Sequence, residues 1–395
     1  MADHRETARW FAARTRAGIE PLVLGRAAAP VQQRVLQGEA ADLRLLPVLT
    51  QHELEPGPYL TAAHATTFDP DSGVDNTAIQ RCWVRGAHTM TWFPYPGSHN
   101  ERNLRKFWAK GEACPVAFWI GHHPAVLLGT QAKLGYPQSH WRAAGGVLGE
   151  PLRLVPSVLH GERIMVPADA EIVIEGHAAP GRFVADGPFG EYTGYLGPQV
   201  QAPLFEVGAI TLRNDAIYHD YGSGLADMLV PDNMAMEGRL FELVRAVAPS
   251  LQNVHVPTEG RRFHAYLQLH RPARGEARDA LAAALAYRRV KAAVAVDEDV
   301  DIFSSERVLW ALATRVQWSR DAFMIDGLSG SSLDPSLPEG ATTASKMGVD
   351  ATLPPARPGA PRLVPPVATV PAAARERARA WLEAGGAAAA QWPRS

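Results

Sequence analysis

Cysteine is scarce in this 395-residue sequence: Cys82 and Cys114 provide neither a disulfide framework nor the spacing of a zinc site. No apolar run is long enough for a transmembrane helix, and the charged N-terminus lacks the apolar segment of a signal peptide. Net charge is also low, because 39 basic residues balance 41 acidic ones. These absences argue against nucleic-acid and membrane partners and favour a cytoplasmic protein in a reducing compartment.

The sequence divides into four segments of different composition and hydrophobic periodicity, and we find no internal repeat among them. Residues 1–42 are rich in Ala and Arg and predict one or two helices. Residues 43–220 contain short apolar stretches broken by Pro, Gly, Asp and Asn, which predicts a β-rich barrel or sandwich. Residues 221–352 alternate between strand and helix periods and predict a small α/β domain. Residues 353–395 read as a Pro-rich linker followed by an amphipathic helix over 372–385.

Individual elements follow from hydrophobic periodicity. Pro115–Ile120 is apolar throughout and predicts a buried strand that ends at Gly121, whereas Glu171–Gly176 alternates and predicts a half-buried strand. The remaining predictions are a helix behind Pro231-Asp232, a strand over Phe263–Leu269, a helix over 276–289, a strand over Lys291–Val296 and a helix over Ser304–Arg315 with Ser304 as its N-cap.

The most informative stretch runs from Asp186 to Glu191, where a Gly-Pro-Phe-Gly sequence separates two carboxylates. Gly187-Pro188 and Gly190 predict a tight loop, because Pro fixes φ and Gly permits positive φ. Such a loop brings both carboxylates to one place, where a partly dry pocket would separate their pKa values for acid–base work. A solvated surface turn is the competing interpretation.

Other polar residues are ambiguous when each is taken alone. Asn76 and Arg81 fit loop capping with a surface charge, and His99 lies in a turn. His122-His123 are adjacent and would face opposite sides of a strand, so we interpret them as structural. The acidic run 296–301 lacks the Gly and Glu of a calcium loop. Lys346 lies among small residues in a predicted loop and fits either a phosphate contact or a solvated lysine.

Taken together and in order, these segments resemble the UbiD family of prenylated-flavin-dependent decarboxylases. The resemblance covers roughly residues 45–354 and rests on eight collinear segments: Asn76–Arg81, His99, Val166–Ala168 with Glu171–Gly176, Asp186–Tyr195, Val296–Ile302, Ala311–Arg315, Leu333–Pro335 and Ser345–Thr352.

The resemblance implies a split β-barrel, like that of flavin reductases, that binds prenylated FMN, followed by a smaller α/β oligomerisation domain. It implies a catalytic trio of Arg81, Asp186 and Glu191. It also implies cofactor contacts from Asn76, Ala78, Ile79, Arg81, Ser98, His99 and Lys346. A divalent metal, usually manganese, and a potassium ion would bridge the cofactor phosphate to the protein. A flavin prenyltransferase would supply the cofactor, and a homodimer or higher homo-oligomer is expected.

Two residues depart from the family pattern. Asp186 stands where a Glu is usual, and it is one methylene shorter. His140 stands four residues before Ala144-Gly145, where the family's third metal ligand is a Glu. Asn76, His99 and His140 therefore form the predicted metal set. An imidazole can bind manganese but does not suit potassium, which prefers oxygen ligands.

The implied reaction is reversible, non-oxidative decarboxylation of an aromatic, heteroaromatic or α,β-unsaturated carboxylic acid through a covalent adduct with prenylated FMN. Arg81 would bind the substrate carboxylate and Glu191 would donate the proton. Two alternatives remain: a non-catalytic flavin- or metabolite-binding subunit of a multi-subunit carboxylase, and an FMN-dependent reductase on the same barrel. The trio argues against the first, and the lack of a nicotinamide fingerprint argues against the second.

Overall fold

The computed structural model describes residues 4–338, 340–353 and 368–384. The chain forms two compact units, 1–352 and 353–395. The second unit contains α9 (Ala372–Ala384), which confirms the predicted terminal helix and buries none of its side chains. Most of the predicted Pro-rich linker, residues 354–367, lies outside the described residues.

A seven-stranded antiparallel sheet organises the first part of unit 1. Its order is β2 (Arg34–Gln37), β14 (Val200–Leu212), β11 (Ile172–Asp186), β8 (Cys114–Ile120), β4 (His64–Phe68) and β5 (Asp75–Ile79), with β7 (Thr89–Thr91) also paired to β14. Smaller sheets are formed by β1 (Leu22–Val23), β9 (Arg153–Ser157) and β10 (Gly161–Pro167), by β3 (Tyr59–Leu60) and β6 (Cys82–Trp83), and by β12 (Phe189–Gly190) and β13 (Leu196–Gly197).

The centre of the large sheet is buried on both faces. All seven residues of β8 are buried, which confirms the predicted strand. Phe118 and Ile174 point into one core cluster, whereas their neighbours Trp119 and Val173 point into another. The prediction of a half-buried strand at 171–176 is therefore wrong, because a second core covers the face expected to be solvated.

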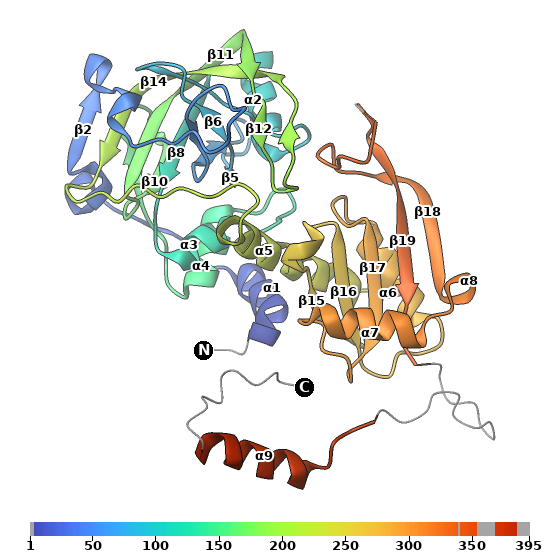
Figure 1. Ribbon diagram of the computed structural model, residues 1–395. Helices are drawn as coiled ribbons and strands as arrows, with labels where there is room; N and C mark the ends of the chain where they lie inside the picture. Colours follow the sequence, from blue (N-terminus) through green and yellow to red (C-terminus); the bar gives the residue numbers. More distant parts are fainter. Residues whose placement is uncertain (1–3, 339, 354–367, 385–395) are drawn as a thin grey trace. The chain divides into compact units, whose positions relative to one another are not determined.

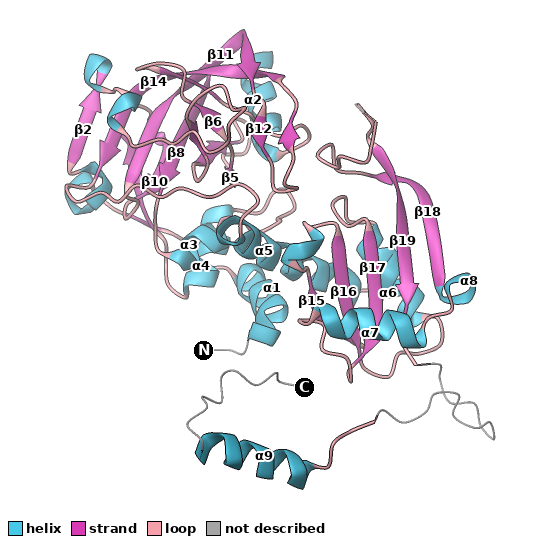
Figure 2. Cartoon of the chain, in the orientation of Figure 1, coloured by secondary structure: helices cyan, strands magenta, loops and turns pink. Residues whose placement is uncertain are grey.

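Among the described residues, the large sheet is open, with β2 and β5 at its edges. The predicted split barrel is thus not confirmed, although the β-rich character of 43–220 is clear in Figure 2. Barrel closure depends on pairing between distant strands, which the pattern within each strand does not encode.

Helices precede and connect these strands. They are α1 (Thr7–Ala17), α2 (His99–Ala109), α3 (Pro124–Gly129) and α4 (His140–Leu148), with short 3₁₀ turns at His4–Glu6, Arg26–Ala28, Pro30–Gln32, Gly38–Ala40 and Leu43–Leu45. The sequence predicts one or two helices in the N-terminal 42 residues; the described residues 4–42 contain α1, but also the strands β1 and β2. Phe11 of α1 packs with Ala143 and Val147 of α4, so α1 joins the same core as the later chain.

A second, five-stranded sheet follows, in the order β15 (Leu251–His255), β16 (His264–Leu269), β17 (Ala292–Asp297), β19 (Thr343–Asp350) and β18 (Ala322–Ser329). Its helices are α5 (Ala226–Arg245), α6 (Glu276–Leu285), α7 (Ser305–Arg315) and α8 (Trp318–Asp321), with a 3₁₀ turn at Thr258–Gly260. The three central strands are parallel, which agrees with the predicted α/β domain.

Both faces of this sheet carry helices. Leu267 and Ala295 pack under α5 and α6, whereas Tyr266 and Val296 pack under α7. Figure 1 shows α6 and α7 on opposite sides of the strands. Ser304 caps α7 as predicted, accepting a hydrogen bond from the Arg307 backbone. The helix expected behind Pro231 instead begins at Ala226 and contains that proline.

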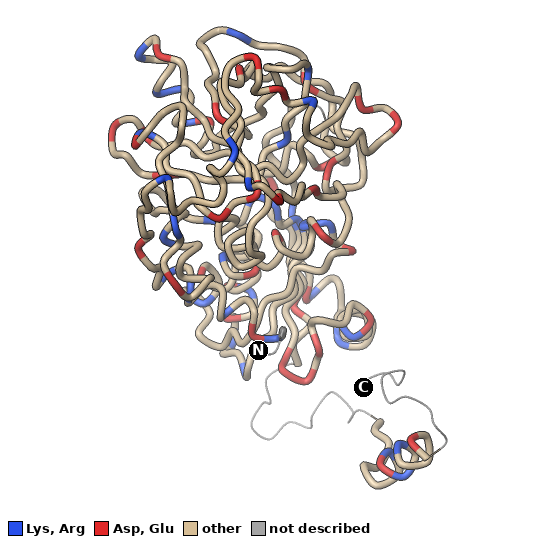
Figure 3. The backbone as a smooth tube through the Cα atoms, turned by 90° about the vertical axis from the view of Figure 1, so that its left-hand side faces the viewer, with Lys and Arg blue, Asp and Glu red and all other residues tan. Residues whose placement is uncertain are grey.

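Charge is interspersed along the chain, with basic and acidic residues mixed in Figure 3. This agrees with the balanced composition and favours no extended field of one sign. Cys82 and Cys114 are both buried and free of disulfide bonds. Within residues 4–338, 340–353 and 368–384, no helix combines the length and apolar character that crossing a bilayer requires.

A histidine in the core of β4 predicts acid sensitivity. His64 is fully buried, stacks on Trp119 with 4.0 Å between ring centroids, and has a pKa that burial lowers to about 3. The unfolded chain therefore binds more protons below pH 6.5, so stability should fall as pH decreases, by up to about 2 kcal/mol at pH 5. We expect His64→Phe to remove this component in denaturant unfolding at pH 7 and pH 5. His177→Phe, at a half-exposed position, is the control; an unchanged pH slope in His64→Phe would contradict the prediction.

Candidate active site

Arg81 lies between the two predicted carboxylates. Its Nε donates to Asp186 Oδ2 at 2.9 Å and its Nη2 approaches the same oxygen at 2.8 Å, while Nη1 donates to Glu191 Oε1. Arg81 lies in the connection between β5 and β6, Asp186 ends β11, and Glu191 follows β12. The structure thus brings the predicted trio together, although Arg81 and Glu191 are far apart in the sequence.

The Asp186 carboxylate is held in place by hydrogen bonds to both of its oxygens. Its side chain has no solvent exposure, and its second oxygen accepts hydrogen bonds from Thr91 Oγ1 at 2.7 Å and Tyr59 Oη at 3.4 Å. The Tyr59 hydroxyl in turn accepts the Gly187 amide at 2.9 Å. A carboxylate with partners on both oxygens has little freedom to move, so Asp186 holds the Arg81 guanidinium in one orientation.

Two aromatic rings complete the surroundings of Arg81. Its guanidinium carbon lies 4.7 Å from the centre of the Phe93 ring and 5.0 Å from that of Phe189. The Arg81 side chain is only 10% exposed. Rings at these distances attract the cation and keep water away, which strengthens its interaction with any carboxylate that reaches it.

Glu191 differs from Asp186 in its environment. Burial is the main cause that raises the pKa of Glu191, and the nearby charge of Asp186 raises it further. The positive charges of Arg81, Arg262 and Arg289 act in the opposite direction without reversing the shift. A buried carboxyl with a raised pKa can carry a proton at a pH where an ordinary Glu has lost it, which suits a proton donor.

The loop between the two carboxylates is tight, as predicted. Of its two glycines, Gly190 does not adopt the positive φ that we expected. Gly187 has φ = 93°, which favours glycine, whereas Gly190 has no positive φ. Position 190 requires glycine because there is no room for a side chain. A Cβ atom there would lie 2.2 to 2.9 Å from three ring atoms of His52. The Gly190 amide donates to Glu55 Oε1 at 3.1 Å, so His52 and Glu55 anchor this loop.

The predicted metal ligands lie near one another. Asn76 Nδ2 donates to Asn100 Oδ1 at 2.6 Å, and Asn100 follows His99 in the first turn of α2. His140 begins α4, is buried, and lies close enough to His99 for their charges to interact. His140 Nδ1 is buried and has no hydrogen-bond partner among the described residues.

In the described part of the chain, no three His, Cys, Asp or Glu side chains lie together in a group that could hold a metal ion. The predicted set has a different composition, because its third donor is the amide of Asn76. The set therefore stays a prediction.

Three further cofactor residues were predicted on and near these elements. Ala78 and Ile79 lie on β5, the edge strand of the large sheet, and Ser98 caps α2 by accepting the Glu101 amide at 3.2 Å. The hydroxyl of Ser98 is therefore already engaged with the helix.

The position and contacts of Lys346 differ most from those predicted. It lies in β19 rather than in a loop, it is buried, and its ammonium group donates to the carbonyl oxygens of Leu285, Tyr287 and Arg288 at 2.9 to 3.3 Å. An ammonium group has three protons, so these contacts leave none for a phosphate. We therefore withdraw its assignment as a phosphate ligand, as well as the alternative of a solvated lysine.

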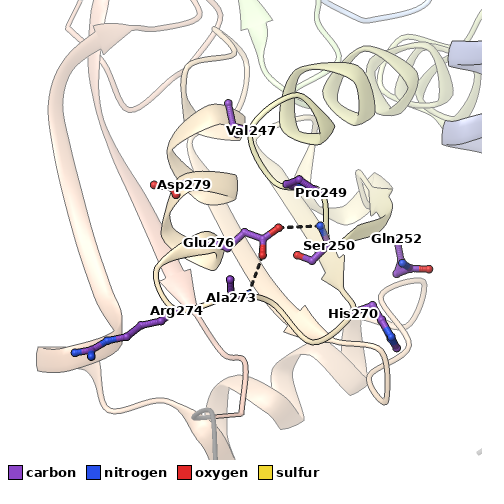
Figure 4. Close-up of a pocket in the computed structure, with 9 residues that line it drawn as sticks. All are labelled: Val247, Pro249, Ser250, Gln252, His270, Ala273, Arg274, Glu276 and Asp279. Carbon is purple, nitrogen blue, oxygen red and sulfur yellow. Dashed lines mark hydrogen bonds between the residues drawn. The ribbon is translucent and has the colours of Figure 1, made fainter.

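A cavity of about 590 Å³ lies elsewhere, beside the second sheet. Figure 4 shows Glu276 at its centre, accepting the Ser250 and Ala273 amides at 2.8 Å each. Its other lining residues are Val247, Pro249, Gln252, His270, Arg274 and Asp279. No member of the trio or of the predicted metal set lines it, so we do not assign the chemistry to this cavity.

Comparison with known protein families identifies the family to which this chain belongs. Residues 23–225 match the model described as the 3-octaprenyl-4-hydroxybenzoate carboxy-lyase Rift-related domain, and residues 233–351 match that of the corresponding C-terminal domain. The chain belongs to the UbiD family. It is accordingly a UbiD-type carboxy-lyase.

Relatives of this UbiD chain extend the comparison. Anhydromevalonate phosphate decarboxylase of Methanothermobacter thermautotrophicus is 34% identical over 318 residues, which are 80% of this chain and 74% of the relative. The structure of the UbiD-class enzyme HmfF from Pelotomaculum thermopropionicum, in complex with FMN, is 36% identical with a TM-score of 0.86, covering 92% of this chain and 81% of that one. Apo 3,4-dihydroxybenzoic acid decarboxylase (AroY) of Klebsiella pneumoniae is 28% identical with a TM-score of 0.82, covering 96% and 82%.

The UbiD site also contains residues that the sequence did not reveal. Thr91 and Tyr59 hold Asp186, and no spacing signal marks either of them. A group of cations surrounds Asp232 of α5: Lys133, Arg262 and Arg289. The consecutive arginines after Gly260 were a signal that could have found part of this group, because a glycine indicates a loop and binding residues are concentrated on loops.

The contact between Gly190 and His52 yields a prediction for turnover in this UbiD enzyme. We expect Gly190→Ala to push the His52 ring away, to loosen the loop that carries Glu191, and to lower turnover about tenfold or more, because small displacements of reacting groups are costly. The double variant Gly190→Ala with His52→Ala should recover part of the rate. Full activity of Gly190→Ala, measured as CO2 release, would show that the loop tolerates the shift.

Proposed function

We propose that this UbiD enzyme catalyses reversible, non-oxidative decarboxylation of a conjugated carboxylic acid (aromatic, heteroaromatic or α,β-unsaturated), with prenylated FMN as cofactor. The observation that carries the proposal is Arg81 held between Asp186 and Glu191 in a nearly dry environment. HmfF structures with FMN and with prenylated FMN support the cofactor. When bound, the prenylated flavin supplies the electron sink that a conjugated carboxylate lacks.

Each member of the trio has a distinct role in the proposal. Arg81 binds and orients the substrate carboxylate through its planar fork. Asp186 fixes Arg81 and balances its charge, because it contacts two nitrogens of the guanidinium. Glu191 holds a proton that burial retains and delivers it to the carbon atom that loses CO2. In the reverse direction Glu191 accepts that proton.

The chain offers a fitting edge for the flavin. β5 pairs with β4 alone in the described sheet, so the backbone groups on its other side are available to a ligand. Ala78 and Ile79 would help to hold the flavin through these groups, and Arg81 lies two residues after Ile79. We assign the flavin-binding half to 43–220 and an oligomerisation half to 221–352, with a homodimer or higher oligomer; one HmfF structure is of an evolved dimeric form.

Asn76, His99 and His140 fit a divalent metal such as manganese. Burial, aided by the nearby charges of His99 and Lys133, lowers the pKa of His140 to about 3. The imidazole is therefore neutral near pH 7, which is the form that binds metals. Its buried Nδ1 has no partner in the described residues, and a metal ion would satisfy it. Potassium is less compatible with two imidazoles, because it prefers oxygen ligands.

Replacing His140 tests the metal set. We expect His140→Ala to lower manganese content about tenfold or more by elemental analysis, because it removes a ligand. His140→Glu, which restores the usual UbiD residue, should retain the metal, and His177→Ala on β11 is the control. Unchanged metal content in His140→Ala would exclude His140 from the set.

The function itself is tested by co-expression with a flavin prenyltransferase, a visible spectrum of the purified protein, and CO2 release from a panel of conjugated acids. Flavin-dependent CO2 release is the expected result. Bound flavin with no CO2 release from any acid would favour the non-catalytic subunit, and flavin-dependent NADH oxidation would favour the reductase.

A further inference from the structure

A cluster of cations is concentrated around one carboxylate near the trio. Asp232 of α5 contacts Arg262 Nη1 at 2.8 Å and Arg289 Nη1 at 3.1 Å, and it also accepts from Lys133 Nζ. The four side chains are only 7% to 25% exposed. Within these contacts three positive charges therefore meet one negative charge in a largely dry place, and Arg262 and Arg289 also act on the nearby Glu191 carboxyl, whose pKa burial raises. A buried surplus of this kind is unfavourable unless an anion completes it.

This cation cluster, Lys133, Arg262 and Arg289 with Asp232, adjoins the loop that carries Glu191. The guanidinium carbon of Arg262 lies 4.5 Å from the centre of the Tyr192 ring, and that of Arg289 lies 5.8 Å from it. Tyr192 is the residue after Glu191. Two members of the cluster thus contact the residue that directly follows the proposed proton donor.

The backbone that presents Arg262 adopts a rare conformation. Arg261 has φ = 47° and Arg262 has φ = 67°, so two consecutive non-glycine residues are left-handed. Strain of this kind persists where the surrounding structure requires it, often at ligand sites. In addition, Arg262 Nε is buried and has no hydrogen-bond partner among the described residues. Part of the Arg262 fork is thus unsatisfied in a residue that is 6% exposed.

From these observations we infer that the cation cluster is a second anion site, which binds a distal carboxylate or phosphate on the substrate. The enzyme would then prefer acids with two anionic groups: one carboxylate on Arg81, where CO2 is lost, and the other group on Arg262 and its neighbours. Arginine forks and an ammonium group together suit such an anion. The inference rests on the proposed function. One relative is named for a phosphorylated acid, anhydromevalonate phosphate, which provides a suitable probe.

The flavin carries a phosphate too, so the experiment must separate the two sources of anion. Binding of anhydromevalonate phosphate and of its dephosphorylated form to the flavin-loaded protein is measured by calorimetry. We expect the phosphorylated acid to bind at least about tenfold tighter to the unaltered enzyme. Arg262→Gln should reduce this ratio to about twofold or less, with flavin content unchanged by absorbance. Equal affinities in the unaltered enzyme would overturn the inference, whether or not the variant folds.

Controls separate charge from structure. Arg262→Lys keeps the charge and should retain part of the preference, and Arg274→Gln, at an exposed position in the second sheet's cavity, should leave it unchanged. Loss of flavin from Arg262→Gln would assign the cluster to the flavin phosphate and would overturn the inference. The calorimetric ratio does not need turnover. The absence of CO2 release would therefore count only against the proposed function, whereas the affinity ratio and the flavin content decide the second anion site.

Discussion

Glu191→Gln is expected to lower the rate of CO2 release about 10²- to 10⁴-fold, the usual contribution of a positioned proton donor. Glutamine is close in shape to glutamate and can still accept from Arg81, so flavin and substrate binding should be retained. The loss should therefore appear in kcat rather than in KM. Without a proton donor, the carbon that loses CO2 is not protonated, so no more than one CO2 per active site is expected before the enzyme stalls.

The pH profile gives an independent check of the same role. Because burial raises the pKa of Glu191, the protonated form persists above the ordinary range of a glutamate, and kcat should decrease as pH rises through that pKa. Glu191→Gln should lose this limb of the profile. Glu162→Gln, at an exposed position on β10, is the control. A wild-type rate in Glu191→Gln would remove Glu191 from the mechanism.

The trio could be predicted from the sequence because it depends on the order of short motifs. Asp186 and Glu191 belong to one compact stretch, and Arg81 ends another. Only the fold brings them together: the register across β4 and β8 aligns the end of β5 with the start of β11, and Asp186, at the far end of the 15-residue β11, meets Arg81 beside Thr91 of β7. No property of Arg81 alone distinguishes it from a surface arginine.

Other features were not predictable because they depend on what packs against a segment. The alternating sequence at 171–176 indicates one solvated face, yet a second core covers that face. Lys346 reads as a loop lysine among small residues, but carbonyl oxygens at the end of α6 and just beyond it receive its protons. The cation cluster comes from four separate segments, and only the fold places them around Asp232.

Arg81→Gln should both abolish turnover and destabilise the protein. Turnover should fall about 10²-fold or more, because the substrate carboxylate loses its bidentate partner and its orientation. Stability should fall by about 3–5 kcal/mol, because Asp186, which has no solvent exposure, would keep a buried charge without its cation. Denaturant unfolding at pH 7 measures the second effect, and CO2 release measures the first.

The double variant Arg81→Gln with Asp186→Asn separates these effects. Removing both charges should restore most of the stability, because an amide costs less to bury than an unpaired carboxylate, whereas turnover should stay low because no fork binds the substrate. Arg81→Lys keeps the positive charge without the guanidinium fork, so its stability and its turnover should lie between those of the parent and those of Arg81→Gln. If Arg81→Gln were as stable as the parent, or if the double variant released CO2 at the parent rate, the guanidinium would be neither the structural centre of this site nor its substrate anchor.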